Sequence, residues 1–147
     1  MLHNTCDYNV FKENIQPMWE VPENANGGRW LITIDKSRHH DLLDAVWLEV
    51  LLAVIGDQFG KYTDDICGIV VNIRNKGSKI SIWTTNASND ESNLKIGYYL
   101  SSPLLFLREV TCLCGKGLQG LFFFSPVETL QLIGCFYEGK LCGYNEG

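Results

Sequence analysis

One segment, from Ile66 to Thr85, constrains the fold more than any other part of the chain. Two runs rich in β-branched residues, 66–74 and 79–85, flank the polar sequence Asn-Lys-Gly-Ser at 75–78. Strand-forming runs separated by a short segment that contains glycine are typical of a β-hairpin. We therefore expect an antiparallel pair with a four-residue loop, in which Arg74 lies opposite Lys79.

This hairpin has one apolar and one polar face, because side chains alternate along a strand. Like charges opposite each other destabilise a sheet unless an anion lies between them, and a phosphate chain would suit the two cations. The alternative is a solvated face with both cations in water. The apolar face would carry Ile69, Val71, Ile73, Ile80 and Ile82, and the polar face Asn72, Arg74, Lys79, Ser81 and Trp83.

The remaining patterns up to about residue 97 predict an α+β fold. Arg29 to Asp35 resembles a strand that follows a glycine turn, and a helix is expected from an N-cap at Asp41 to Ile55. A second helix is expected to begin within 88–91. Strands separated by a helix, with one antiparallel hairpin, indicate an antiparallel sheet with helices on one face.

Size and charge set limits on function. The chain has 147 residues, 46% of them hydrophobic, and a net charge of −5. That is one domain's worth of sequence, and its acidity excludes nucleic-acid binding through a broadly basic surface. The longest apolar run, Ala45 to Ile55, is interrupted by Glu49 and is too short to cross a bilayer. We expect a soluble, cytoplasmic protein with reduced cysteines.

The sequence QPMWEVPEN at 16–24 places Trp19 and Glu20 between two prolines. An indole offers a flat face for stacking on a base, and a carboxylate can accept two parallel hydrogen bonds from the N–H edge of a guanine. A purine with a positive charge would suit this pair best. The alternative is that Trp19 covers the core at a loop while Glu20 is solvated.

The predicted helix over 42–55 is apolar around most of its circumference, with only Asp44 and Glu49 charged. A surface helix needs an apolar stripe of only about 100°. The apolar surface beyond this stripe is either covered by the last part of the chain or forms an exposed patch that receives an amphipathic helix from a partner.

The last 50 residues give weaker signals. GKGLQG at 115–120 matches the glycine pattern of dinucleotide sites, but the LFFFSP that follows is a poor helix start. The spacing of the four cysteines is not that of a usual zinc site. The three histidines lie in expected loops or at the terminus. The cysteines are Cys112, Cys114, Cys135 and Cys142, and the histidines are His3, His39 and His40. We therefore expect no catalytic residue, no metal and no cofactor.

Five stretches between Cys6 and Gly97 carry a family resemblance: CDYNVFKENIQPMWE, GGRWLITIDK, DAVWLEVLLAVIGDQF, YTDDICGIVVNIRNKGSKISIWTT and NLKIG. Together they resemble the eukaryotic translation initiation factor 4E family, whose members bind the 7-methylguanosine cap of messenger RNA. The resemblance implies a curved antiparallel sheet with helices packed on its convex face and the cap on the concave side.

The resemblance also implies roles for individual residues. Trp19 would be one of two tryptophans that sandwich the methylated base, and Glu20 the carboxylate that accepts from it. Arg74 and Lys79 would hold the cap phosphates, and Trp83 would lie near the methyl group. The helical motif of scaffold factor 4G and of the 4E-binding proteins would dock on Trp47, Leu48, Glu49 and Leu52.

Two departures from the family qualify these expectations. The second sandwich tryptophan of the family lies upstream of the region that matches Cys6, and the sequence diverges after Gly97. We therefore expect a partial cap-binding domain over 1–97, truncated at its N-terminus, and a divergent segment over 98–147. Because base stacking is worth about 1–3 kcal/mol per aromatic ring, the missing tryptophan predicts a weakened cap affinity.

The expected function is thus non-enzymatic: cap binding and translation initiation through a helical scaffold partner, with no membrane or DNA as a partner. The alternative is a protein-interaction module that binds scaffold or inhibitor helices without holding a cap. An enzyme built on the last part of the chain, dependent on zinc or a dinucleotide, is disfavoured.

Overall fold

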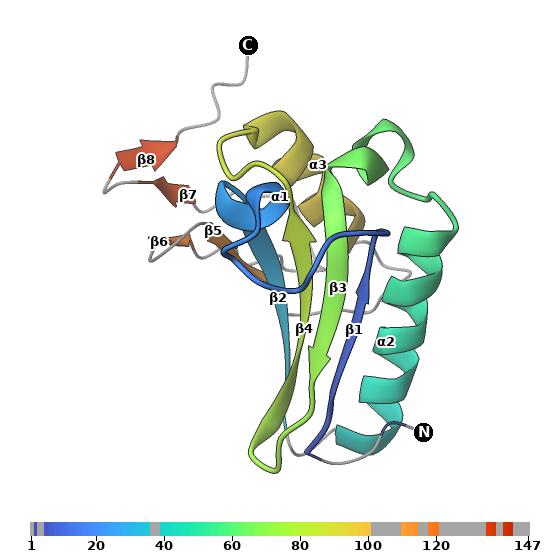
Figure 1. The fold of residues 1–147 in the computed structure, drawn as a ribbon. Coiled ribbons are helices and arrows are strands. Elements are labelled where there is room, and N and C mark those ends of the chain that lie inside the picture. Colours follow the sequence, from blue (N-terminus) through green and yellow to red (C-terminus); the bar gives the residue numbers. More distant parts are fainter. Residues whose placement is uncertain are drawn as a thin grey trace.

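The structure, a computed structural model, describes residues 2, 5–35 and 39–100 and the backbone of four short strands after residue 100; side chains are described within 2–34 and 42–100. Six strands form one antiparallel sheet in the order β1-β3-β4-β2-β5-β6 (Figure 1). The strands are β1 (Asp7–Phe11), β2 (Gly28–Asp35), β3 (Ile66–Asn72), β4 (Gly77–Thr84), β5 (Val110–Cys114) and β6 (Leu118–Gly120), and a separate pair consists of β7 (Cys135–Tyr137) and β8 (Lys140–Cys142).

The described helices are α1 (Pro22–Ala25), α2 (His39–Ile55), the 3-10 helix η2 (Gly60–Asp65) and α3 (Asp90–Leu100). The long helix α2 runs lengthwise beside the sheet (Figure 1). Side chains of α2 and α3 join the same buried cluster as one face of the sheet. The expected α+β fold, a curved antiparallel sheet with helices packed on one face, is therefore confirmed. None of the described helices combines the length and apolar character needed to span a bilayer.

The two faces of the sheet follow from strand register. Ile69 lies opposite Ile82 and Val71 opposite Ile80, and all four side chains are fully buried. We call the side to which they point, covered by α2 and α3, the core face. The other side, on which Asn72, Lys79, Ser81 and Trp83 lie, we call the open face. The division predicted from the alternation of residues along the hairpin is confirmed.

The register of the hairpin differs from the prediction. Lys79 pairs with Asn72 rather than with Arg74, and β3 ends at Asn72. The amide of Gly77 donates to the carbonyl of Arg74 (3.2 Å), and Gly77 has φ of +136°. Glycine adopts this conformation without strain, so the chain reverses within a tighter turn than the four-residue loop that we expected. The shift is two residues, which preserves the face of every side chain.

Other boundaries agree with the sequence or move slightly. The strand expected at Arg29 begins one residue earlier, and the second helix begins at Asp90 as expected. The first helix begins at His39 rather than after an N-cap at Asp41. An N-cap preference is worth only about 1 kcal/mol, so the rest of the structure can override it.

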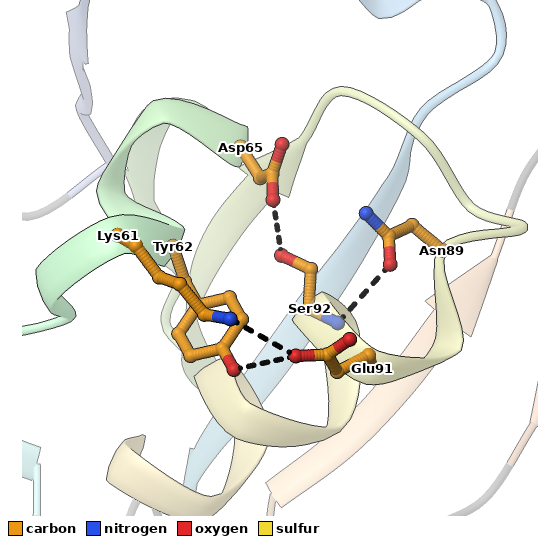
Figure 2. A network of polar contacts seen from close by, with 6 residues as sticks. All are labelled: Lys61, Tyr62, Asp65, Asn89, Glu91 and Ser92. Carbon is orange, nitrogen blue, oxygen red and sulfur yellow. Dashed lines mark hydrogen bonds and ion pairs between the residues drawn. The ribbon is translucent and has the colours of Figure 1, made fainter.

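Helix α3 is joined to η2 by polar contacts at its N-terminus (Figure 2). Glu91 accepts hydrogen bonds from the Lys61 ammonium (3.2 Å) and the Tyr62 hydroxyl (2.9 Å). The Ser92 hydroxyl donates to Asp65 (2.5 Å), while the Ser92 amide donates to the side chain of Asn89 (3.2 Å). The last contact is an N-cap bond, so Asn89 fixes where the helix begins.

The indole of Trp30 fills the space between β2 and α3. Its Nε1 donates to the carbonyl of Asn93 (3.1 Å), and the ring is 1% exposed. A Cβ atom on Gly97 would clash with three carbons of this ring. Glycine at this position therefore allows α3 to approach the sheet closely.

We predict that Gly97→Ala destabilises the protein. Overpacking costs about 1–3 kcal/mol, whereas the better helix propensity of alanine recovers only about 1 kcal/mol. The free energy of unfolding, measured with urea, should fall by about 1 kcal/mol and by at most about 2 kcal/mol. Lys95→Ala, at an exposed position of the same helix, should change it by less than about 0.5 kcal/mol. A Gly97→Ala variant as stable as the wild type would contradict this account of the packing.

Candidate functional site

Two tryptophans meet on the open face of the sheet. The rings of Trp19 and Trp83 are stacked, with centroids 3.9 Å apart and planes inclined by 20°. Phe11 packs edge-on against Trp83 at 5.6 Å. Trp83 is buried, whereas Trp19 is partly exposed. The segment that carries Trp19 has no regular structure, as its two prolines predict.

This aromatic contact rests on a second, smaller core. Cys67 and Val70 are buried with Trp83, and Phe11, Ile15 and Trp19 pack against them. Burial raises the pKa of the Cys67 thiol, which donates weakly to the carbonyl of Glu23 (3.6 Å). The sulfur is therefore a packing group in its protonated form.

A row of polar side chains extends from Trp83 along the open face. Every second residue of β4 points to this face, which gives the row Lys79, Ser81 and Trp83. At a rise of roughly 3.3 Å per residue, the Cα atoms of Lys79 and Trp83 are about 13 Å apart. Lys79 is exposed. The Ser81 hydroxyl and Trp83 Nε1 are buried without a hydrogen-bond partner among the described residues. Unpaired buried groups are costly, and a site that takes a polar ligand is one place where they persist.

Arg74 follows the end of β3 and is held by Asp7 of β1. Nη1 donates to Asp7 Oδ1 (2.6 Å) and Nη2 to Oδ2 (3.1 Å), and Nη1 also donates to the carbonyl of Ile73 (2.9 Å). The hydrogen bond from Arg74, helped by one from Asn72, lowers the pKa of Asp7. The carboxylate therefore stays charged at neutral pH, and the pair is lost only as pH falls below the ordinary range of an aspartate.

The geometry of this pair leaves one edge of the guanidinium unused. A guanidinium has five N–H donors, and Asp7 binds the edge formed by the two terminal nitrogens. No hydrogen bond to a described residue uses Nε or the second hydrogen of Nη2. These two donors lie on one edge, which matches two oxygens of a phosphate. Asp7 thus orients Arg74 without occupying all of its donors.

Glu20 follows Trp19 and is exposed. Its carboxylate has no hydrogen bond or ion pair with any described residue. It is therefore free to accept hydrogen bonds from a ligand.

Arg29 is a cation of the open face that the sequence did not single out. It lies directly opposite Trp83 in the β2–β4 pair and is partly exposed. The alternation of the predicted strand places it on this face once the partner strand is known. The sequence alone does not reveal this position, because it depends on the pairing of β2 with β4, which are distant in sequence.

The candidate partner residues of α2 divide between two sides of the helix. Trp47 is buried in the main core, 9% exposed. Leu48 and Leu52 are 53% and 52% exposed, and Ile55 is 68% exposed; Glu49 is also exposed. Of the two predicted fates of the apolar surplus, the exposed patch is the one observed at these positions.

The remaining candidates fall mostly outside the description. The structure describes no side chain for the cysteines after residue 100, the glycine sequence at 115–120 or the three histidines. Within the described residues, His, Cys, Asp and Glu form no cluster that could hold a metal ion.

Comparison with known proteins points to one family. The family model described as eukaryotic initiation factor 4E matches residues 1–113. The chain is 58% identical over 104 residues to eukaryotic translation initiation factor 4E-1 of Caenorhabditis elegans, covering 71% of this chain and 49% of the relative. It is 54% identical over 92 residues to the Homo sapiens factor 4E, covering 63% and 42%. The chain thus spans about half the length of these relatives or less.

Solved structures agree. Ascaris suum eIF4E-3 in complex with the m7G cap has a TM-score of 0.74 and 41% identity, covering 90% of this chain and 71% of that chain. C. elegans eIF4E-3 with the 4E-binding protein Mextli and a cap analogue has a TM-score of 0.68 and 45% identity, covering 76% and 63%. With this sheet, these helices and these matches, the chain belongs to the eukaryotic initiation factor 4E family.

Proposed function

We propose that this chain binds the 7-methylguanosine cap of messenger RNA on its open face and acts in translation initiation through a helical scaffold partner. The observation that carries the proposal is the stacked pair of Trp19 and Trp83, together with Glu20, which follows Trp19 in sequence and whose carboxylate has no partner among the described residues. A flat cationic base needs an aromatic face and an acceptor for its N–H edge, and these residues provide both. Family members of this fold have been solved with cap analogues.

The cations suit the phosphates of such a ligand. Lys79 lies on the same face of β4 as Trp83, and Arg74 presents a free donor edge at the end of the neighbouring strand. A chain of phosphates that leaves a base at Trp19 would extend toward Lys79 and Arg74. This explains why cations occur on the open face of a chain with a net charge of −5.

The affinity for the cap is proposed to be weak. At a centroid distance of 3.9 Å, Trp19 and Trp83 leave no room for a base between them. The base must therefore stack on the other face of Trp19, or Trp19 must leave Trp83 before a base enters. In the first case the base gains one stacking contact, and in the second an existing aromatic contact is lost, which is worth about 0.5–1.5 kcal/mol.

A second function has its own support. Leu48, Leu52 and Ile55 form an apolar row on the outer side of α2, with spacings of four and three residues. A row of this kind fits the apolar face of an amphipathic helix. The solved relative in complex with Mextli shows that a 4E protein can hold a 4E-binding protein. The chain could therefore act as an interaction module that binds scaffold or inhibitor helices without a cap.

Retention on immobilised 7-methylguanosine triphosphate tests the first function. We predict that Glu20→Ala lowers the affinity at least about tenfold, because hydrogen bonds to a charged group contribute about 1.5–3 kcal/mol. The matched control is Glu13→Ala, an exposed glutamate earlier in the same loop, which should behave as the wild type. If the wild type is not retained but still binds a helical 4E-binding peptide, the interaction module is the correct function.

The role of Arg74 is tested with two ligands that differ only in phosphates. Lysine has no planar donor edge, so Arg74→Lys cannot hold both Asp7 and a phosphate in the same way. We predict that it weakens binding of 7-methylguanosine triphosphate about tenfold, the equivalent of about 1.4 kcal/mol, and leaves binding of the nucleoside unchanged. Tryptophan fluorescence titration measures both. Equal losses for the two ligands would assign Arg74 to the fold rather than to phosphate binding. Lys76→Ala, an exposed cation at the hairpin tip, is the control.

The helix patch is tested by Leu52→Glu. A carboxylate on an apolar docking surface should weaken binding of a helical 4E-binding peptide at least about tenfold, because the charge loses water without a partner. Since Leu52 is half exposed, the thermal stability and the retention on cap resin should stay unchanged. Isothermal titration with the peptide provides the measurement, and unaltered peptide affinity would exclude this surface. Glu20→Ala, with normal peptide binding, is the reciprocal control.

A further inference from the structure

Asn24 is a completely buried polar residue in the short helix α1, 0% exposed. Its Nδ2 donates to two backbone carbonyls, those of Gln16 and Met18, each at 2.8 Å. The two carbonyls flank Pro17, and the second belongs to the residue directly before Trp19. Both hydrogens of one amide group are thus used to hold the backbone from which the Trp19 indole projects.

The helix that carries Asn24 is itself fixed to the sheet. The Gly27 amide donates to the carbonyl of Asn24 (2.9 Å), and the Gly28 amide donates to the Thr84 hydroxyl (3.3 Å). Gly27 lies so close to the carbonyl of Thr84 that no side chain would fit. Asn24 therefore has a fixed position relative to the end of β4.

Trp83, on which Trp19 stacks, precedes Thr84 in that strand. A continuous chain of contacts therefore links the two indoles. It runs from Trp83 along β4 to Thr84, through the glycine turn to Asn24, and through the Asn24 amide to the loop that carries Trp19. Within the described part of the chain, Asn24 provides the only side-chain hydrogen bonds to residues 16–20. Pro17 restricts its own φ, so fixing the carbonyls on both sides leaves the loop little freedom.

Packing alone does not explain an asparagine here. The Oδ1 atom of Asn24 is buried and has no partner among the described residues. An apolar side chain of similar size would avoid that unpaired oxygen. The amide is explained by its two donors, which satisfy carbonyls that the open backbone of the loop could not satisfy itself.

We propose that Asn24 is the positioning residue of Trp19: its amide sets the distance and orientation of the loop so that the Trp19 indole lies parallel to Trp83. The geometry of the indole pair depends on Asn24 whether or not the chain binds a cap. The consequence for ligand affinity rests on the proposed function, since a base can stack only on a ring that is held in place.

The first test needs no ligand. Two stacked indoles couple excitonically and give a couplet in the far-ultraviolet circular dichroism spectrum. The Trp19→Phe variant lacks one of the two indoles, so its spectrum provides the reference without the couplet. Asn24→Asp keeps the shape but removes both donors and places an acceptor against two carbonyls. We expect this variant to lose most of the couplet at a temperature where the protein is folded. Asn24→Ala, which removes the donors without adding charge, should do the same and serves if the aspartate variant does not fold.

Asn93 supplies a matched control. It is also a buried asparagine whose Nδ2 donates to two carbonyls, those of Asn86 (3.0 Å) and Ala87 (3.2 Å), but it lies in α3. Asn93→Asp should lower the melting temperature as Asn24→Asp does, yet retain the couplet. A full couplet in the folded Asn24 variants, or an equal loss in Asn93→Asp, would overturn the proposal.

The second test measures ligands. Asn24→Asp should weaken binding of 7-methylguanosine triphosphate on the order of tenfold while a helical 4E-binding peptide binds α2 normally. Asn93→Asp should alter neither by more than about twofold. If the wild type binds no cap analogue, the proposed function fails, and the couplet alone decides the role of Asn24. If the folded Asn24 variants bind the cap analogue as tightly as the wild type, Asn24 contributes to the fold but not to ligand binding.

Discussion

Strand β4 lies between β3 and β2, and the alternation of its side chains divides the molecule into a core and a candidate binding surface. Ile80 and Ile82 point to the core face and are fully buried. Lys79, Ser81 and Trp83 must then point to the open face, because a strand has only two sides. A register slip of one residue would exchange the two sets, at a prohibitive cost in buried charge. The main core therefore fixes the positions of a cation and an indole that contribute little to it.

The open face depends on a second level of organisation, in which irregular backbone is held against the regular sheet. Trp19 reaches Trp83 from a loop with no strand or helix of its own. Such a loop is positioned by the packing of its side chains and by contacts that satisfy its backbone groups, and the amide of Asn24 provides two of these contacts. Arg74 is similar: it follows the end of a strand, and a carboxylate from β1 holds its guanidinium. In both cases one residue lies on a strand, Trp83 on β4 or Asp7 on β1, and a polar contact positions the residue that meets it.

The outer side of α2 has a different origin. Leu48, Leu52 and Ile55 are exposed although the helix already buries Leu43, Val46 and Val50 against the sheet. These three side chains lie outside the buried core of the described residues. Exposed apolar rows on a stable helix are the usual form of a docking surface for another helix. The two candidate surfaces lie on opposite sides of the sheet, so they can be altered independently.

Sequence patterns alone predict part of the fold: the hairpin with its two faces, β2, α2 and the start of α3. They do not predict β1, α1 or η2. Alternation in 66–74 and 79–85 predicted which side chains are buried, and the glycine turn predicted β2. Composition indicates that any nucleotide contact must be local, and the quoted stretches alone indicate the family. These properties are local or additive along the chain, so periodicity and residue type are sufficient to predict them.

Which side chains contact one another across the open face depends on the tertiary structure. The pairing of Lys79 with Asn72 depends on the geometry of the turn between them. The position of Arg29 opposite Trp83 and the ion pair of Asp7 with Arg74 join segments far apart in sequence. So does the direct stacking of Trp19 on Trp83, where the sequence suggested separate places around a base. These contacts depend on register, turn geometry and loop hydrogen bonds in combination. A shift of one or two residues in any of them changes the contacts but leaves the sequence pattern unaltered.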